Sequence, residues 1–138
     1  MATIKRFEDL EVWKKARTLA KKIYFVTSQE PLAKDFRLRD QMRGSAGAIM
    51  DNVAEGFDRG SRFEFVNSLG YSKGETGELK SQIYRCLNAE YFTQELFDEL
   101  YNDTDEVAKM ISSFIDYLNN SEIRGQKFKN RKDGKTGN

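Results

Sequence analysis

Few residues of this chain could carry out catalysis. Histidine, the most versatile catalytic side chain, does not occur in it. Without histidine, serine and cysteine triads, zinc-hydroxide hydrolases and Glu-x-x-His di-iron sites are excluded in their usual forms. The one cysteine, Cys86, falls on the apolar side of a helical pattern, so we expect a small core side chain rather than a nucleophile. We therefore expect no enzymatic activity, no metal, no cofactor and no small-molecule substrate.

Three glutamates, Glu55, Glu75 and Glu78, could form an acid–base pair or a metal site if their carboxylates met. A helical hairpin that turns near residue 60 places Glu55 close to the turn and Glu78 far from it, so the three cannot converge within one bundle. We interpret them as polar side chains at the margin of the core. The predicted structural polar motif consists of Gln41, Asn52, Glu55, Gly56 and Glu78.

Basic side chains are the remaining candidates for a binding site. They cluster on one predicted helix, at its exit turn and on the helix that follows, where they could bind the phosphates of RNA. The alternative is weak surface ion pairing with nearby aspartates and glutamates, and both interpretations stay open. The candidates are Arg39, Arg43, Arg59, Arg62 and Lys73.

The C-terminal tail, residues 121–138, is also basic. It carries six lysines and arginines against two acidic residues, although the whole chain has a formal net charge of only +1. Its glycines and scarce apolar residues predict a flexible, disordered segment. Such a tail can bind phosphate through counterion release, or it can simply keep the protein soluble. The tail residues proposed to contact nucleic acid are Lys127, Lys129, Arg131 and Lys132.

Four helices must position these residues, because apolar side chains recur at intervals of three and four in four long segments. Asp35 is a suitable N-cap for the second helix, and Ser61 with Glu64 forms a capping box for the third. Gly56 and Gly60 are expected to supply the positive φ angles of the turn between them. The predicted helices cover about residues 8–28, 34–57, 61–91 and 94–118.

These helices predict an all-α protein, an antiparallel up-down-up-down four-helix bundle over residues 1–120 with the flexible basic tail behind it. A hairpin that turns near residues 59 and 60 pairs residues 44–48 with 71–75. Both stretches are rich in small residues, so we expect the two backbones to approach closely there. The same register predicts a hydrogen bond between Gln41 and Glu78.

The N-terminus lacks the apolar run of a signal peptide, and no segment is apolar enough for a membrane span. With a single cysteine, a cytoplasmic protein without membrane association is expected. Several aromatic residues lie partly off the inward stripes, which indicates either wide core faces or an oligomer interface. These aromatic residues are Tyr24, Phe25, Tyr84, Tyr101 and Tyr117.

A series of short motifs in a fixed order resembles a known family. The series begins with FEDLEVW at residues 7–13, continues with Gln41-Met42-Arg43 and then with NVAEG at residues 52–56, and extends through Arg59, Glu64-Phe65, Gly74, Glu78-Leu79 and Tyr91. Over about residues 7–118 the chain is similar to the four-helix-bundle proteins encoded by intervening sequences of bacterial 23S ribosomal RNA genes. Gly44 and the pair Met50-Asp51 depart from the usual pattern of that family.

The resemblance implies a ring-like homopentamer without established enzymatic activity, suspected of binding nucleic acid or protein. A related branch serves diversity-generating retroelements as an accessory protein that binds reverse transcriptase and RNA, but its strongly basic surface fits this near-neutral chain less well. We therefore expect a non-enzymatic homo-oligomer that binds RNA or a ribonucleoprotein. The alternatives are a protein-interaction scaffold and an accessory subunit of a reverse transcriptase.

Overall fold

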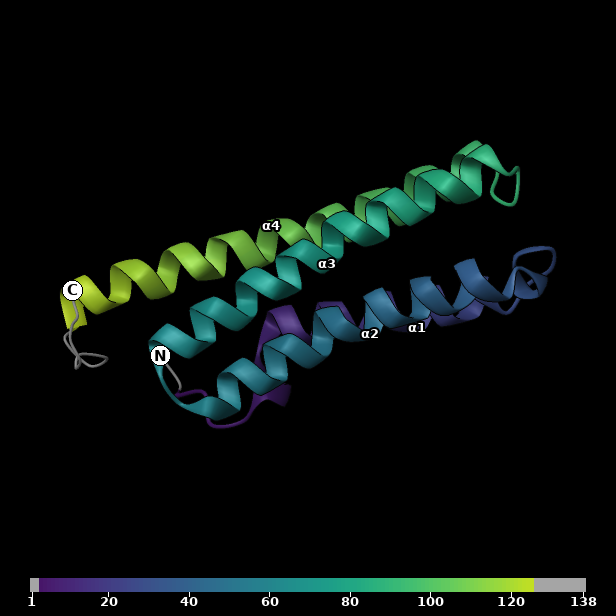
Figure 1. Cartoon of the computed structure of the whole chain (residues 1–138). Coiled ribbons are helices and arrows are strands. Elements are labelled where there is room, and N and C mark those ends of the chain that lie inside the picture. The colour runs from purple at the N-terminus through teal and green to yellow at the C-terminus, as the bar shows by residue number, and fades with distance from the viewer. Residues whose placement is uncertain (1–2, 126–138) are drawn as a thin grey trace.

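The computed structural model describes residues 3–125, and for residues 121–125 it describes the backbone only. Within this range consecutive helices run in opposite directions and pack side by side, which confirms the predicted all-α four-helix bundle (Figure 1). Of the expected tail, residues 121–125 belong to the last helix, and residues 126–138 lie outside the described residues. The elements are η1 (Phe7–Asp9), α1 (Glu11–Thr27), η2 (Leu32–Lys34), α2 (Phe36–Arg59), α3 (Arg62–Asn88) and α4 (Gln94–Gly125).

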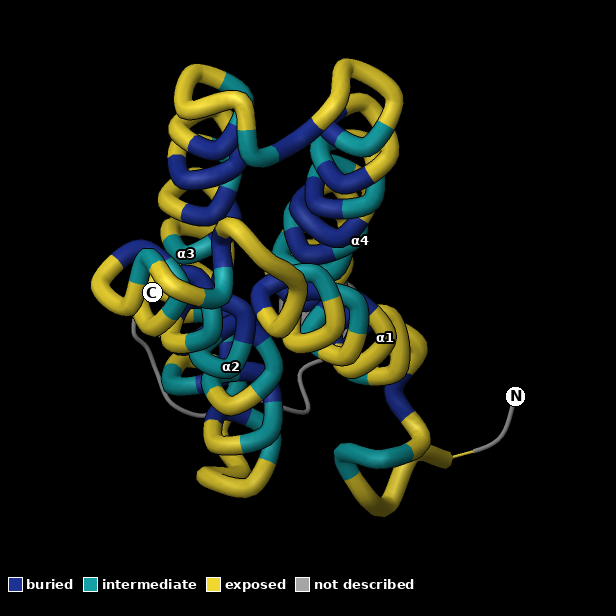
Figure 2. Tube along the Cα trace, turned by 90° about the vertical axis from the view of Figure 1, so that its right-hand side faces the viewer, coloured by how far each residue is buried: buried dark blue, intermediate teal, exposed yellow. Residues whose placement is uncertain are grey.

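The core lies between the four helices and contains most of the predicted apolar stripes, although α1 buries Val12 and Leu19 more fully than the predicted Trp13 and Ala20. The buried faces of the helices turn toward one another, while the exposed residues face outward (Figure 2). Ile49 of α2, Ile83 of α3 and Leu100 of α4 are fully buried, as is Ile23 of α1. Hydrophobic burial of these stripes is the main force that holds the bundle together.

Local capping sets the ends of the central hairpin as predicted. The Leu38 amide donates to Asp35 Oδ1 at 3.3 Å, which caps α2. Gly60 follows α2 with φ of +86°, and the Glu64 amide donates to Ser61 Oγ at 3.1 Å, which caps α3. The Glu64 carboxylate pairs with Arg59 at 3.6 Å instead of reaching back to Ser61.

Three helix ends differ from the prediction. A 3₁₀ turn at Phe7–Asp9 and an extended Leu10 precede α1, so this helix starts later than expected, and the break lets the Phe7 ring contact Trp13 at 5.1 Å between centroids. Helix α3 ends at Asn88, before Tyr91. Helix α4 continues to Gly125, because the weak helix propensity of asparagine does not stop a helix that is already formed.

Gly56 does not supply a positive φ angle but lies inside α2, where α2 meets α3. A Cβ atom at Gly56 would lie 2.6 Å from Ser68 Cβ, closer than real Cβ contacts allow. In contrast, a Cβ atom at Gly44, Gly47 or Gly74 would meet nothing within 4 Å. The expected close contact at these glycines is therefore wrong, although Ser72 of α3 does reach the backbone of α2, donating to the carbonyl oxygen of Ile49 at 2.5 Å.

The register of the hairpin also differs from the expected one. Gln41 Oε1 accepts a hydrogen bond from Arg85 at 3.1 Å, so the predicted bond to Glu78 is wrong. Gln82 similarly reaches Ser45 Oγ at 3.1 Å. Side chains lean toward the N-terminus of their helix, which is away from the turn on α2 and toward it on α3. Each side chain of α2 therefore meets an α3 residue further along than backbone levels alone predict.

Candidate nucleic-acid interface

The predicted basic residues do not form one patch. Arg39 and Arg43 lie in the first half of α2, whereas Arg59 and Arg62 flank the α2–α3 turn at its other end. At 1.5 Å of rise per residue, Arg39 and Arg59 are about 30 Å apart along the helix. Lys73 is exposed on α3 between the two ends, and the four tail residues lie outside the described part of the chain.

Most of these arginines are already occupied by neighbouring acceptors. Arg59 contacts Glu55 at 2.9 Å and Glu64 at 3.6 Å, and the hydrogen bond to Glu55 raises the pKa of its guanidinium. Arg39 binds Asp40 at 2.9 Å and the carbonyl oxygen of Ala33 at 3.2 Å. Their positive charges are largely balanced within the chain, which leaves little for a phosphate.

Arg62 also uses part of its guanidinium within the bundle, since Nη1 donates to Asn119 Oδ1 at 3.1 Å. This contact joins the start of α3 to α4. It indicates that Arg62 has a structural role in addition to any contact with a ligand.

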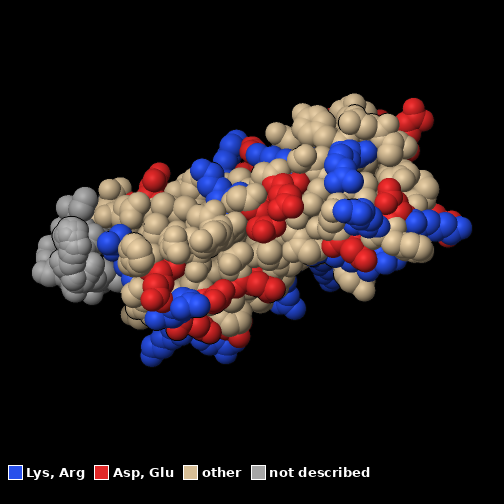
Figure 3. All heavy atoms as spheres, in the orientation of Figure 1, with Lys and Arg blue, Asp and Glu red and all other residues tan. Residues whose placement is uncertain are grey.

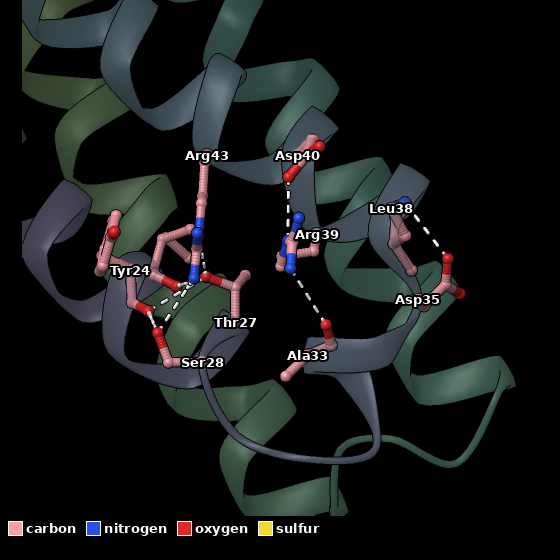
Figure 4. A network of polar contacts seen from close by, with 10 residues as sticks. Tyr24, Thr27, Ser28, Ala33, Asp35, Leu38, Arg39, Asp40 and Arg43 are labelled. Carbon is pink, nitrogen blue, oxygen red and sulfur yellow. Dashed lines mark hydrogen bonds and ion pairs between the residues drawn. The ribbon is translucent and has the colours of Figure 1, made fainter.

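Arg43 is different, because its partners are neutral. It donates to Thr27 Oγ1 at 2.8 Å and to Ser28 Oγ at 3.0 Å, both at the C-terminal end of α1 (Figure 4). Its guanidinium carbon lies 4.0 Å from the centre of the Tyr24 ring, within the range of a cation–π contact. The side chain is therefore held in place, while no carboxylate of the described part of the chain compensates its charge.

Helix α1 adds two further cations on the same side of the bundle. Arg17 and Lys21 are exposed and one helical turn apart, and neither has a carboxylate partner within residues 3–125. With Tyr24, Phe25 and Met50 they line a shallow hollow of about 580 Å³ between α1 and α2. We call this surface the α1–α2 face. It consists of Arg17, Lys21, Tyr24, Phe25, Arg43 and Met50.

Of the other basic residues of α1, Lys14 pairs with Glu11 of the same helix, and Lys15 and Lys22 turn toward the acidic residues of α4. Lys22 contacts Glu99 at 2.6 Å and also Asp103, and the hydrogen bonds to these carboxylates raise its pKa. Lys15 contacts Glu106 at 3.1 Å. Basic and acidic side chains are likewise mixed over the face shown in Figure 3. The two flanks of α1 thus differ: among the residues that the structure describes, the cations beside α4 are paired with carboxylates, and Arg17 and Lys21 beside α2 are not.

The sequence pattern singled out Arg43 but missed its neighbours on α1. The lysines of the first helix looked like ordinary solvent contacts. A usable signal was present, since Arg17, Lys21, Tyr24 and Phe25 follow a spacing of four, three and one that places two cations and an aromatic ring on one helical face.

Comparison with known proteins supports the fold and the family. The family described as "23S rRNA-intervening sequence protein" matches residues 8–113. The chain belongs to this family. A crystal structure of a protein of unknown function from the S23 ribosomal protein family of Bacteroides thetaiotaomicron has a similar fold, with a TM-score of 0.71. The two sequences are 26% identical, and the match covers 76% of this chain and 95% of that chain. A search of curated proteins finds no significant match.

In this 23S rRNA-intervening sequence protein the residues of the polar motif lie along α2 and α3, and the contacts described for them are made within the bundle. Asn52 donates to the carbonyl oxygen of Ala48 at 2.9 Å, and Gly56 is the close approach to α3. Gln41 and Glu55 are exposed and bind Arg85 and Arg59, respectively. Glu78 adjoins Glu75, whose pKa is raised by burial and then by the charge of Glu78.

The remaining candidates for chemistry are placed as core or surface residues. Cys86 is buried, with Sγ at 3.5 Å from Met42 Sδ, and burial raises the pKa of its thiol to about 12. This confirms the expected core position. Within residues 3–125 no three cysteine or acidic side chains lie close enough to hold a metal ion. None of the helices described there is long and apolar enough to cross a membrane.

Proposed function

We propose that this protein is a non-enzymatic helical bundle that binds single-stranded RNA through the α1–α2 face and works as a homo-oligomer. The observation that carries the proposal is Arg43, which is fixed on Tyr24, shares a face with Arg17 and Lys21, and has no carboxylate partner among the described side chains. Unpaired cations attract phosphates, and exposed rings such as Tyr24 and Phe25 offer surfaces on which bases stack.

The exposure of the two rings supports the same proposal. Tyr24 is 60% exposed and Phe25 is 66% exposed, although both sit on a helix that buries its other side in the core. A lone exposed aromatic residue needs no explanation, but two of them among cations match the chemistry of a single-stranded nucleic acid.

Self-association is supported by other exposed aromatic residues. Phe63, Tyr71 and Tyr84 are 69%, 65% and 49% exposed, respectively. All three belong to α3, which contributes no residue to the α1–α2 face. A symmetric assembly of the kind that the family resemblance implies would bury such side chains and present several copies of the RNA-binding face side by side.

The proposal is tested by RNA binding at several salt concentrations, measured by fluorescence anisotropy with a labelled single-stranded RNA of mixed sequence. Arg17→Glu, Lys21→Glu and Arg43→Glu together should weaken binding by at least about tenfold and reduce the salt dependence, because phosphate contacts release counterions.

Lys21→Glu and Lys73→Glu form a matched pair, since both lysines are exposed and lack a carboxylate partner in the described part of the chain. Equal effects of these two single changes would contradict the assignment to the α1–α2 face.

The exposed aromatic residues of α3 also favour a second candidate, a protein-interaction scaffold. It predicts a stable oligomer that does not bind RNA at any salt concentration. Light scattering together with the RNA titration separates the two candidates.

A further inference from the structure

A polar hollow lies between α3 and α4, and no residue of the α1–α2 face lines it. Its volume is about 480 Å³, and Ala108 is the one apolar residue among the described residues of its lining. Such a lining suits a charged ligand that forms hydrogen bonds better than an apolar one. The polar residues of the lining are three lysines, two serines and an aspartate: Lys73, Lys80, Lys109, Ser112, Ser113 and Asp105.

The register of the two helices sets the ends of this hollow. At one end, Lys80 Nζ contacts Asp105 Oδ1 at 2.7 Å. Lys73 precedes Lys80 on α3 by about two helical turns, and Ser112 follows Asp105 on α4 by the same interval. Because α3 and α4 are antiparallel, Lys73 and Ser112 reach the same level at the other end. Lys109 lies between the two levels, so all three ammonium groups border one short stretch of surface.

The lysines of the hollow outnumber its carboxylate. Asp105 accepts a hydrogen bond from Lys80 and pairs with Lys109 at 3.1 Å, and these hydrogen bonds lower the pKa of its carboxyl group. Lys73 is exposed and has no ion pair among the described side chains. Three ammonium groups against one carboxylate give the lining a net charge of +2. A ligand with two negative charges would balance it.

The two serines add hydrogen-bond donors to the same surface. A helical serine or threonine can satisfy its hydroxyl group on a carbonyl oxygen one turn back, as Thr104 does with Leu100 at 2.7 Å. Ser112 and Ser113 make no side-chain hydrogen bond within the described part of the chain. Both hydroxyl groups are therefore available to a ligand that presents several oxygen acceptors.

We propose that this hollow binds a phosphoryl dianion, carried by a small phosphate monoester or present as inorganic phosphate. The dianion matches the net charge of the lining, and its oxygens accept several hydrogen bonds at once. Asp105 holds two of the lysines beside each other and is a positioning residue. The donors to the phosphoryl group are Lys73, Lys109, Ser112 and Ser113.

This site differs from the α1–α2 face in the ligand that it suits. Its described lining has no aromatic ring on which a base could stack, and each phosphodiester of RNA carries only one charge. Because no residue of the α1–α2 face takes part, the inference does not depend on the proposed RNA binding.

Ligand-observed ³¹P NMR with the full chain tests the chemistry of the site, at about pH 8, where a phosphate monoester is a dianion. The probes are glycerol 3-phosphate and inorganic phosphate, and the control is dimethyl phosphate, a diester with one charge. The protein should broaden the resonances of both probes saturably and that of the diester little. The tighter of the two probes identifies the source of the phosphoryl group, and equal affinities would show that the site recognises this group alone. Equal broadening of the diester and the monoester would overturn the proposal.

Surface variants test the location of the site. Lys73→Gln should weaken the binding of glycerol 3-phosphate at least about fivefold, because it removes a charged donor. Ser112→Ala combined with Ser113→Ala should also weaken it, through loss of two neutral donors. Lys21→Gln is the matched control, since Lys21 is likewise an exposed helical lysine without a described carboxylate partner but lies on the α1–α2 face. Equal losses for Lys73→Gln and Lys21→Gln would overturn the proposal, and so would binding that survives Lys73→Gln.

Discussion

At the residue scale, the tightest packing constraint is the absence of a side chain at Gly56. Gly56→Ala should lower the free energy of unfolding by about 1–3 kcal/mol, because its Cβ would collide with Ser68. The measurement is urea unfolding followed by circular dichroism. Gly44→Ala is the matched control, since its Cβ would meet nothing within 4 Å and should stabilise α2 by up to about 1 kcal/mol. Equal losses for the two variants would contradict this role of Gly56.

Glu75 is the residue whose ionisation should oppose folding. Burial and the charge of Glu78 raise its pKa in the folded protein, although a hydrogen bond to Ser45 acts in the other direction. Between the ordinary glutamate pKa of about 4.3 and the raised value, the folded state binds more protons than the unfolded state. The stability contribution of this group therefore falls as the pH rises through that window, and the loss persists above it.

Glu75→Gln should accordingly raise the melting temperature at pH 7 and leave it nearly unchanged at pH 4, where the carboxyl group is mostly protonated. Thermal unfolding at the two pH values measures the difference. Asp51→Asn, at an exposed carboxylate of α2, should show no such gain at pH 7. A melting temperature that rises equally at both pH values would show that the effect is not one of ionisation.

At the element scale, Asp35 joins two connections at one end of the bundle that are distant in sequence. One carboxylate oxygen caps α2, and the other accepts a hydrogen bond from the Tyr91 hydroxyl at 2.9 Å, in the turn between α3 and α4. This hydrogen bond raises the pKa of Tyr91. A single side chain therefore both starts α2 and fixes the α3–α4 turn beside it.

Asp35→Ala should destabilise the protein by about 1 kcal/mol or more through loss of the cap. Tyr91→Phe should cost less, because the cap remains. Chemical denaturation of both single variants and of the double variant forms a cycle, and the two changes should be less than additive. Full additivity would show that the two groups do not interact in solution.

At the scale of the whole molecule, parts of the surface of α3 have no explanation within one chain. Gly70 and Gly74 are exposed, their Cβ positions are open, and each weakens an isolated helix by nearly 1 kcal/mol. Tyr71 beside them is 65% exposed. Contact with another copy of the chain would explain both the small residues and the exposed ring.

We predict that light scattering will give a mass several times the 16.0 kDa of one chain. Tyr71→Glu should lower this mass toward that of a monomer, because it places a charge in the contact. Tyr24→Glu is the control, since Tyr24 is 60% exposed but belongs to the α1–α2 face, and it should leave the mass unchanged. A monomeric native protein would contradict the prediction, and so would a mass that is insensitive to Tyr71→Glu.

The sequence by itself determined the helices, the caps and the core. These features depend on residues within about four positions of one another, as in the contact from Ser61 to Glu64 or the apolar stripe through Ile49 and Val53. The order of short motifs likewise sufficed to predict the family. Of the candidate site, the sequence supplied Arg43 but neither Arg17 nor Lys21.

Only the tertiary structure decided the register of the hairpin, the role of Gly56 and which lysines and arginines are paired with carboxylates. The positive charge of Arg43 faces the neutral hydroxyl groups of Thr27 and Ser28, whereas the charge of Lys22 is balanced by the carboxylate of Asp103. Such partners lie on other helices, and their identity depends on how each helix is rotated and on the direction in which its side chains lean. A local sequence pattern contains the period of a helix but not these relative positions.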